Sequence, residues 1–386
     1  MAKHGKYEKR TPRGKKLSSG TAGVIALVLT LAILGWGLTN MGVPTNTGSA
    51  APTNLGIMDR FDMQMTNQIS SALEGVLSIE KVYWLNDDDQ IAPEPNPDNF
   101  GTTRDPSSMA SFLAEAKKLL GVENTLFNTN VQLYLDSEIT YYLDETIMVI
   151  TWKQLIDGTV YTLSEVKIAH PSQFRRFLAD GTYGSDKQYT TTQMAATVNA
   201  VTASSGDFYK FRTYGIKVYD GQVMSVHSVV DTCFITEDGD FLFSYRGEIT
   251  DKETAQQFVD ENNVRFSLAF GPVLVDNHEC VPVPGNYTLG EVKDHYPRAA
   301  ICKMGDLHYL MVAANQDPDR GLRAVPTMAA FAQVLQGFGA EKAYALDGGQ
   351  TAVIVTNDKL INRPSYGYQR LISDIIYFAT ALPDGG

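Results

Sequence analysis

The chain has 386 residues, a net charge of −12 and three cysteines. This length is enough for one large domain or two ordinary ones, and a hydrophobic share of 44% is typical of a globular protein. Three cysteines are too few for a disulfide scaffold. Cys280 and Cys302 could pair, but we interpret them as small buried thiols. An acidic body argues against nucleic-acid binding, which depends on Lys and Arg at phosphates.

Charge is unevenly placed along the chain. Residues 1–16 hold seven Lys or Arg residues against the single acid Glu8, so this tail carries +6 and the remaining chain carries −18. Residues 21–39 contain no charged side chain, and about 20 such residues are enough to cross a bilayer. Trp36, near the far end of this run, suits the membrane–water interface. We therefore expect a basic cytoplasmic tail over residues 1–20, one transmembrane helix over 21–39, and the rest of the chain outside the cell membrane.

A cleaved signal peptide is the alternative interpretation of this apolar run. The apolar part of a signal peptide usually covers only about 7–15 residues and ends at a site of small residues. The run here is longer, although Ser49-Ala50-Ala51 downstream would suit cleavage. The prediction is therefore an uncleaved anchor.

Residues 40–129 are interpreted as a linker followed by a membrane-proximal helical region. Residues 41–55 are rich in Gly, Pro, Ser, Thr and Asn, which is typical of a flexible linker. Apolar residues recur every three or four positions from Met58 to Val76, which predicts one helix, and residues 106–120 predict a second. Neither helix carries residues that indicate chemistry.

Residues 130–386 are predicted to form one domain of class α+β, with mixed β-sheets and a few packed helices. Short β-branched and aromatic runs separated by turns predict the strands. These are residues 131–135, 139–143, 147–152, 163–169, 216–219, 231–236, 241–244, 266–275 with a kink at Gly271-Pro272, 298–302, 307–313 and 372–378. Helical spacing of apolar residues predicts helices over 171–178, 192–201, 254–261 and 327–337.

Common catalytic and cofactor motifs are absent from the sequence. The chain lacks the glycine-rich fingerprints of dinucleotide and phosphate binding, the G-x-S-x-G nucleophile turn, the H-E-x-x-H zinc motif and any C-x-x-C pair. The six histidines show no metal-ligand spacing, so a zinc site is not expected. His308, on a predicted strand, is the one histidine that we single out as a candidate.

Two acidic turns carry the residues that most suggest chemistry. An apolar run ends at Asp347, which is followed by two glycines and a second apolar run. Glycines allow positive φ and let a ligand approach the backbone closely. The other turn, Gly206-Asp207, also follows an apolar run and precedes aromatic residues and Arg212. Taken alone, the first turn reads as an ordinary hairpin corner and the second as a capped turn.

Five segments in sequence order resemble the signatures of the phosphodiester glycosidase family. They are T-A-S-S-G-D-F-Y-K-F-R at 202–212, F-G-P-V-L-V at 270–275, P-R-A-A-I at 297–301, the helix and Asp-Gly-Gly turn at 330–351, and the ending at 362–374. The resemblance covers residues 139–380. Two positions depart from the family pattern: Ser205 stands where the family has Asn, and Gln350 stands where it has Gly.

The resemblance implies a hydrolase that cleaves the bond between the anomeric carbon of a sugar and a phosphodiester. Such a reaction builds positive charge on the sugar, which a carboxylate stabilises or attacks. The departing phosphate ester needs cations more than a strong acid. The resemblance makes Asp207 and Asp347 the candidate catalytic residues. The candidate substrate-binding residues are Arg212, Arg298, Gly348, Gly349, Thr351 and Arg363, with glycine N–H groups offered to ligand oxygens.

Cofactors, partners and alternatives follow from the same resemblance. No cofactor is expected, and a hard cation such as calcium, held by the carboxylates, is left open. The expected partners are a glycan phosphodiester of the cell envelope or an exopolysaccharide, and the membrane, with no nucleic acid and no prediction of oligomeric state. The departures at Ser205 and Gln350 leave a catalytically weakened glycan-binding module as the first alternative. A structural envelope protein that self-associates through the membrane-proximal helix is the second.

The resemblance also carries a geometric prediction. Because one carboxylate rarely suffices for glycosyl transfer, we expect Asp207 and Asp347 to face one pocket. Arg298 and Arg363 should lie on its wall, and Phe208 or Tyr209 should partly close it. Proximity of the two acids should then raise the pKa of one of them. Arg370 is interpreted as a surface ion-pair residue.

Overall fold

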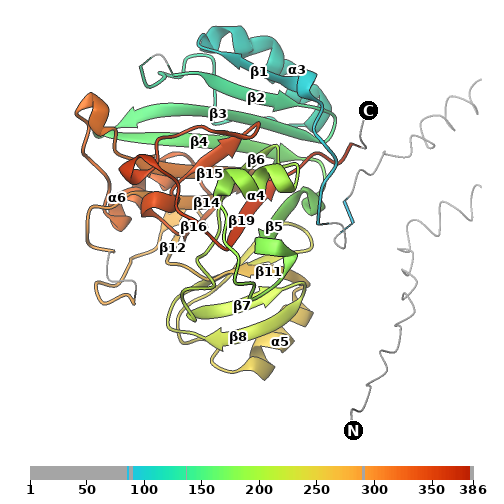
Figure 1. Cartoon of the computed structure of the whole chain (residues 1–386), viewed down its shortest axis with the longest axis vertical. Helices are drawn as coiled ribbons and strands as arrows, with labels where there is room; N and C mark the ends of the chain where they lie inside the picture. The colour runs from blue at the N-terminus through green and yellow to red at the C-terminus, as the bar shows by residue number, and fades with distance from the viewer. Residues whose placement is uncertain (1–84, 87–89, 136, 289–291, 383–386) are drawn as a thin grey trace, which may run out of the picture. The chain divides into compact units, whose positions relative to one another are not determined.

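The computed structural model describes residues 85–86, 90–135, 137–288 and 292–382 (Figure 1). They belong to one compact unit. The predicted tail, transmembrane helix, linker and helix at 58–76 lie outside the described residues. Within the part of the chain that the structure describes, no helix is both long enough and apolar enough to cross a bilayer.

A nine-stranded antiparallel sheet forms the centre of this unit. The order across it is β1-β2-β3-β4-β15-β14-β16-β12-β13. Its strands are β1 (Phe100–Thr103), β2 (Ile139–Leu143), β3 (Ile147–Ile156), β4 (Thr159–Ile168), β12 (Val273–Asp276), β13 (Glu279–Cys280), β14 (Arg298–Gly305), β15 (His308–Asn315) and β16 (Lys342–Leu346). β3 and β4 pair along their whole length and are the long strands in Figure 1.

Both faces of this sheet are buried, because successive residues of its central strands point into two different cores. In β14, for example, Ala300 belongs to one core and Ala299 to the other. The first core is completed by α3 (Ala110–Leu120) and α6 (Met328–Gly337). The second is completed by a five-stranded sheet and by one face of a three-stranded sheet, both described below. This double burial explains why the strands read as near-continuous apolar runs.

A five-stranded sheet packs over the second core, in the order β18-β17-β6-β19-β5. Its strands are β5 (Phe174–Leu178), β6 (Thr202–Ser205), β17 (Ile354–Thr356), β18 (Lys359–Leu360) and β19 (Asp374–Phe378). The helix α4 (Thr191–Thr197) packs on this sheet, where Met194 and Ala195 share a third core with Ala203 and Ile375 (Figure 1).

A smaller group of elements has a core of its own. It contains the hairpin of β7 (Gly215–Tyr219) and β8 (Gln222–His227), the helix α5 (Lys252–Glu261), and a three-stranded sheet. That sheet has the order β10-β9-β11, with β9 (Thr232–Thr236), β10 (Phe241–Ser244) and β11 (Val264–Leu268). In Figure 1, β7, β8 and α5 lie at the opposite end of the unit from α3 and β1.

The predicted α+β class with few helices is confirmed. Within the described residues every strand pair runs antiparallel, whereas mixed sheets were expected. Short turns between consecutive strands, as in β3–β4, β7–β8 and β14–β15, permit only antiparallel pairing.

Two predicted elements are wrong. Residues 171–178 form a 3-10 turn, η3 (Pro171–Gln173), followed by β5 instead of a helix. Phe174, Phe177 and Leu178 have helical spacing, but both faces of β5 are buried, which hides the two-residue period of a strand. Residues 131–135 form no strand.

The predicted boundary at residue 130 does not divide the described unit. β1 pairs with β2, and α3 places Ala116 in the first core. The segment that carries β1 and α3 therefore folds together with the strands that follow it.

Candidate active site

Asp347 directly follows β16, and the two glycines after it allow the turn to pack against Pro297. A Cβ atom on Gly348 would collide with the carbonyl oxygen of Pro297. Gly349 has a φ of 65° and donates its N–H to the same oxygen at 2.9 Å. The Gly-Gly pair is therefore explained by a close backbone approach. Contrary to the expectation that both glycines offer N–H groups to a ligand, the N–H of Gly349 is already used.

Three hydroxyl groups hold this turn in place. Ser205 Oγ donates to the carbonyl of Thr351 at 2.6 Å, and Thr351 Oγ1 donates to the carbonyl of Gly348 at 2.5 Å. Ser365 Oγ donates to the carbonyl of Gly349 at 3.2 Å. Thr351 is thus a turn residue and does not line the hollow described below. Ser205, a departure from the family pattern, ties β6 to the turn.

A hollow of about 160 Å³ lies beside Asp347. Its lining consists of Asp347, Gln350, three arginines (Arg212, Arg298 and Arg370), four aromatic residues (Phe208, Phe270, Tyr296 and Tyr366), and Ala299, Met328, Leu346 and Gly348. Oδ2 of Asp347 and Nε2 of Gln350 are buried and have no hydrogen-bond partner among the described residues. Buried polar atoms are nearly always hydrogen-bonded, so these two atoms are suited to contacts with a bound molecule.

The environment of Asp347 changes its acidity. Burial raises the pKa of this carboxyl group to about 6, while a side-chain hydrogen bond with Thr351 and the positive charges of Arg370 and Arg212 act in the opposite direction. Burial disfavours the charged form of an acid because that form loses its hydration. Asp347 therefore changes its protonation state close to neutral pH, which suits a group that takes part in chemistry.

The three arginines of the hollow are held on aromatic rings. The guanidinium of Arg212 lies 5.6 Å from the ring centre of Phe208 and 5.5 Å from that of Phe270. Arg370 lies 4.6 Å from the ring centre of Phe208. Arg298 donates from Nη2 to the carbonyl of Asp294 at 2.7 Å. Stacked guanidinium groups keep donors at their edges, so this wall is suited to a phosphate group.

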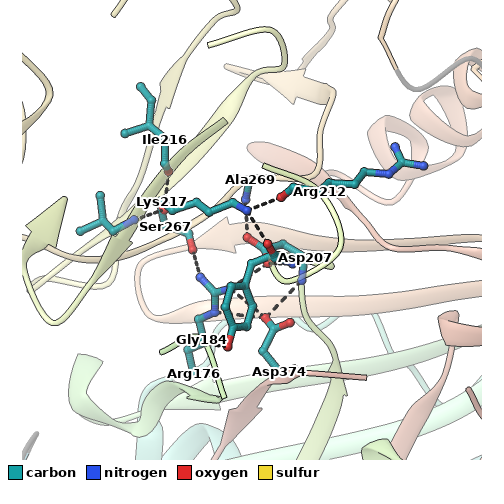
Figure 2. A network of polar contacts seen from close by, with 11 residues as sticks. Arg176, Gly184, Asp207, Arg212, Ile216, Lys217, Ser267, Ala269 and Asp374 are labelled. Atoms are coloured by element: carbon teal, nitrogen blue, oxygen red, sulfur yellow. Dashed lines mark hydrogen bonds and ion pairs between the residues drawn. The ribbon is translucent and has the colours of Figure 1, made fainter. Parts of the chain in front are cut away.

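Asp207 does not share this hollow, so the prediction of one pocket with two carboxylates is wrong. Its side chain is fully buried, and Oδ1 accepts a hydrogen bond from Arg176 Nη2 at 2.7 Å (Figure 2). The carboxylate also accepts from the N–H groups of Tyr209 at 3.0 Å and Ala269 at 2.7 Å. Sequence reasoning missed Arg176, because it lies in a segment that was predicted to be a helix. With these donors, Asp207 is a structural anion.

Arg176 also binds a second acid, Asp374, at the start of β19. Nε and Nη2 of Arg176 lie 3.1 Å and 2.9 Å from Asp374 Oδ2, which in addition accepts the N–H of Asp207 (Figure 2). Asp374 fills the space beside Gly206, where any Cβ atom would overlap its carboxylate. Gly206 is therefore required by packing against the ion pair.

Lys217 connects this buried cluster to the wall of the hollow. It is buried on β7, and its Nζ donates to the carbonyls of Tyr209 and Arg212 (Figure 2). Burial lowers the pKa of Lys217. The loop that supplies Phe208 and Arg212 to the hollow is thus fixed between Asp207 and Lys217.

Several other candidate residues lie elsewhere. Arg363 pairs with Asp319 at 3.0 Å and does not line the hollow, contrary to prediction. Phe208 lines the hollow and Tyr209 does not, in agreement with the prediction that one of the two would border the pocket. His308 donates to or accepts from Glu165 at 2.8 Å, a structural contact between β15 and β4.

The described residues contain no disulfide bond and no group of side chains placed to hold a metal ion. Cys280 and Cys302 are free thiols, and no group of three or more His, Cys, Asp or Glu side chains there is placed to hold a metal ion. The calcium hypothesis stays a prediction.

The sequence contains little that identifies Arg370 and Gln350 as residues of the hollow. Arg370 was interpreted as a surface residue because nothing near it in the sequence indicates a partner. Its place in the hollow follows from the packing of its loop against Phe208 and Phe211. Gln350 was visible only as a departure from a glycine, and the structure places its amide next to the catalytic candidate.

The site combines one acid of raised pKa with a hollow bordered by three arginines. Residues 197–379 match the family model described as Phosphodiester glycosidase, and this part of the chain belongs to that family. The match lies inside the region that the sequence signatures indicated, so that prediction is confirmed. The comparison with curated proteins gives no match.

Two solved structures are among those to which this chain is similar. A hypothetical protein from Synechocystis is 14% identical, with a TM-score of 0.44, and the alignment covers 65% of this chain and 64% of that protein, under two thirds of its length. The catalytic domain of zebrafish N-acetylglucosamine-1-phosphodiester alpha-N-acetylglucosaminidase, auto-inhibited by its pro-peptide, is 16% identical with a TM-score of 0.47. That alignment covers 61% of this chain and 83% of the zebrafish domain. The family assignment rests on the family model.

The structural role of Asp207 can be tested by Asp207→Asn. Losing one charge leaves Arg176 and Lys217 in a buried cluster with a single carboxylate, so the free energy of unfolding should fall by about 3 kcal/mol or more. Urea denaturation measures this change. Asp319→Asn, in the exposed pair with Arg363, is the matched control and should change stability by less than about 1 kcal/mol. Unchanged stability with complete loss of turnover would instead place Asp207 in the chemistry.

Proposed function

We propose that this protein hydrolyses sugar-1-phosphodiesters at the bond between the anomeric carbon and the phosphate oxygen. The observation that carries the proposal is Asp347, an acid of raised pKa with one unpartnered buried oxygen, in a hollow with three arginines. Membership of the phosphodiester glycosidase family supports the same reaction class. We extend the proposal to a substrate that belongs to a glycan of the cell envelope or to an exopolysaccharide.

The arginines support the departure of the phosphate ester. When the C1–O bond breaks, the electron pair stays on the phosphate oxygen and positive charge builds on the sugar ring. Arg212, Arg298 and Arg370 supply fixed positive charge for that oxygen, so the reaction does not depend on a strong general acid. This agrees with a hollow that contains one carboxylate among the described residues rather than two.

Asp347 acts in its ionised form. It either attacks C1, forming a glycosyl ester that water then hydrolyses, or takes a proton from a water molecule that attacks C1 directly. The first route retains the configuration at C1 and the second inverts it. In both routes the unpartnered oxygen of Asp347 is the group that reacts.

A second candidate function, a glycan-binding module without turnover, is favoured by one observation. Gln350 places an amide in the hollow where the family pattern has glycine, and its Nε2 has no protein partner among the described residues. An amide in this position can bind a sugar hydroxyl without assisting bond cleavage. The same substrate panel separates the two functions.

Asp347→Asn should abolish release of free sugar, by at least about a thousandfold in kcat, because an amide cannot attack or accept a proton. The measurement is release of reducing sugar from α- and β-linked glucose, mannose and N-acetylglucosamine 1-phosphates esterified to a methyl hexopyranoside. Asp319→Asn is the control and should keep the rate of the unaltered protein. The Asn variant should be at least as stable as the parent near pH 8, because it removes a charge whose burial is unfavourable. Binding without turnover by the unaltered protein would favour the glycan-binding module. The absence of both binding and turnover would reject both functions.

The ionisation of Asp347 predicts how the rate of hydrolysis changes with pH. The pKa of Asp347 is raised to about 6, so its carboxylate is ionised above that pH and protonated below it. If the ionised form reacts, kcat/KM should rise as pH rises through about 6 and then level off, since the arginines stay charged. A rate that falls as pH rises through this value would make Asp347 a general acid instead.

We further propose that residues 21–39 anchor the protein in the cell membrane, with the glycosidase domain outside. The support is the sequence: a charge-free run that follows a tail of net charge +6. Protease added to intact cells should digest an epitope at the C-terminus and leave one at the N-terminus intact. Protection of both epitopes until the cells are lysed would contradict this topology.

A further inference from the structure

Gln350 brings an amide group to the hollow beside Asp347. It lies on the turn that follows Asp347, inside the 3-10 turn η6 (Gly349–Thr351), and it stands where the family pattern has glycine. Its Nε2 atom is buried and has no hydrogen-bond partner among the described residues. Buried donors are nearly always hydrogen-bonded, and an unpaired one is unfavourable for the fold. This donor is therefore suited to a contact with a bound molecule.

The lining of the hollow divides into a buried floor and an exposed side. The atoms of Asp347 and Gln350 that lack partners are buried, whereas Arg370 and Tyr366 are exposed. In the proposed reaction the anomeric carbon C1 lies against Asp347. The sugar ring then occupies the floor, and the phosphate lies toward Arg212 and Arg370. The amide of Gln350 consequently meets the sugar rather than the phosphate.

The floor has little room for a bulky substituent on that sugar. The hollow has a volume of about 160 Å³, against roughly 300–1,000 Å³ for most ligand pockets. The turn that carries Gln350 is fixed in place, because Ser205 Oγ donates to the carbonyl of Thr351 at 2.6 Å and the N–H of Gly349 donates to the carbonyl of Pro297 at 2.9 Å. The glutamine side chain thus takes up space that a glycine would leave open.

We propose that Gln350 determines the sugar specificity of the site: it selects a hexose with a hydroxyl group at C2 and excludes one with an acetamido group there. This rests on the proposed function and deepens it, because it names the class of sugar. C2 is next to the reacting carbon, and hydrogen bonds to its hydroxyl group strengthen as charge develops on the sugar.

Hydrogen bonding and space have different parts in this selection. The C2 hydroxyl group accepts the N–H of Gln350 and satisfies its buried donor. The carbonyl of an acetamido group can also accept an N–H, so hydrogen bonding alone does not discriminate. The acetyl group, however, needs the space that the glutamine side chain fills. The selection against acetamido sugars therefore depends on size, and the binding of the hydroxyl group depends on the donor.

The test measures binding, so it does not require turnover. The probes are methyl esters of C-glycosidic phosphonates, in which a methylene group replaces the anomeric oxygen. They come in pairs that differ only at C2: glucose with N-acetylglucosamine, galactose with N-acetylgalactosamine, and mannose with N-acetylmannosamine, each in both anomers. Titration calorimetry with the full-length protein compares the two members of each pair.

Two variants separate size from hydrogen bonding. The unaltered protein should bind at least one hexose probe about tenfold more tightly than its acetamido partner. Gln350→Gly opens the space and should bind that acetamido probe about tenfold more tightly than the unaltered protein does. Gln350→Met keeps the size and removes the donor. It should weaken hexose binding about three- to tenfold, as expected for one hydrogen bond, and leave the weak binding of the acetamido probe unchanged.

Controls keep the comparison interpretable. Asp319→Asn lies outside the hollow and should retain the preference of the unaltered protein. Gln350 is not among the residues with positive φ, so its backbone does not restrict the choice of replacement. Gln350→Ala, which opens most of the same space, replaces the glycine variant if urea denaturation shows that the glycine variant is unfolded.

The outcomes separate the sugar selection from the proposed function. Equal binding of both members of every pair by the unaltered protein, or tighter binding of the acetamido member, overturns the selection and leaves the proposed function standing. A preference that is unchanged in Gln350→Gly and Gln350→Ala also overturns the role of Gln350. Binding of no probe by the unaltered protein overturns the proposed function and the selection with it.

Discussion

The buried ion pair of Arg176 with Asp207 and Asp374 is the interaction on which the rest of the site depends. Arg176 comes from β5, Asp207 follows β6, and Asp374 begins β19, so one guanidinium group joins three strands of the five-stranded sheet. Asp207 also accepts the N–H of Ala269, just beyond β11, and Arg176 donates to the carbonyl of Ser267 on β11. The cluster thus connects this sheet to the smaller group of elements around β7. Lys217 completes it and fixes the loop that forms one wall of the hollow.

Asp207 and Asp347 show how the environment assigns different roles to the same side chain. Both acids are buried, and each lies just beyond a buried strand. Asp207 is surrounded by a guanidinium group and two backbone N–H donors, so its carboxylate oxygens are occupied by contacts within the fold. Asp347 keeps one oxygen without a donor among the described residues, and burial raises its pKa. A buried carboxylate oxygen without a donor is unfavourable for stability, which makes Asp347, at a hollow with three arginines, a candidate for chemistry rather than for folding.

The same contrast applies to the backbone near the hollow. Gly206, Gly348 and Gly349 relieve crowding, because the space for their side chains is taken by Asp374, Pro297 and Tyr296. Phe208 and Tyr366 instead keep large side chains in a conformation that suits glycine. Local rules are therefore obeyed where the turn supports the fold and broken where side chains face the hollow. Departures of this kind are expected at functional sites.

The sequence by itself determined the α+β class, most helices and strands, the phosphodiester glycosidase family, and the turn that carries Asp347. These depend on local patterns, namely apolar periodicity, Gly-containing turns and short ordered signatures, which the chain carries wherever its neighbours lie. Only the tertiary structure decided that β5 is a strand, that Asp207 is a structural anion, and that Arg370 rather than Arg363 lines the hollow. Those outcomes depend on which charges meet after the strands have paired. Arg176 lies 31 residues from Asp207 and 198 from Asp374, and no local pattern specifies such contacts.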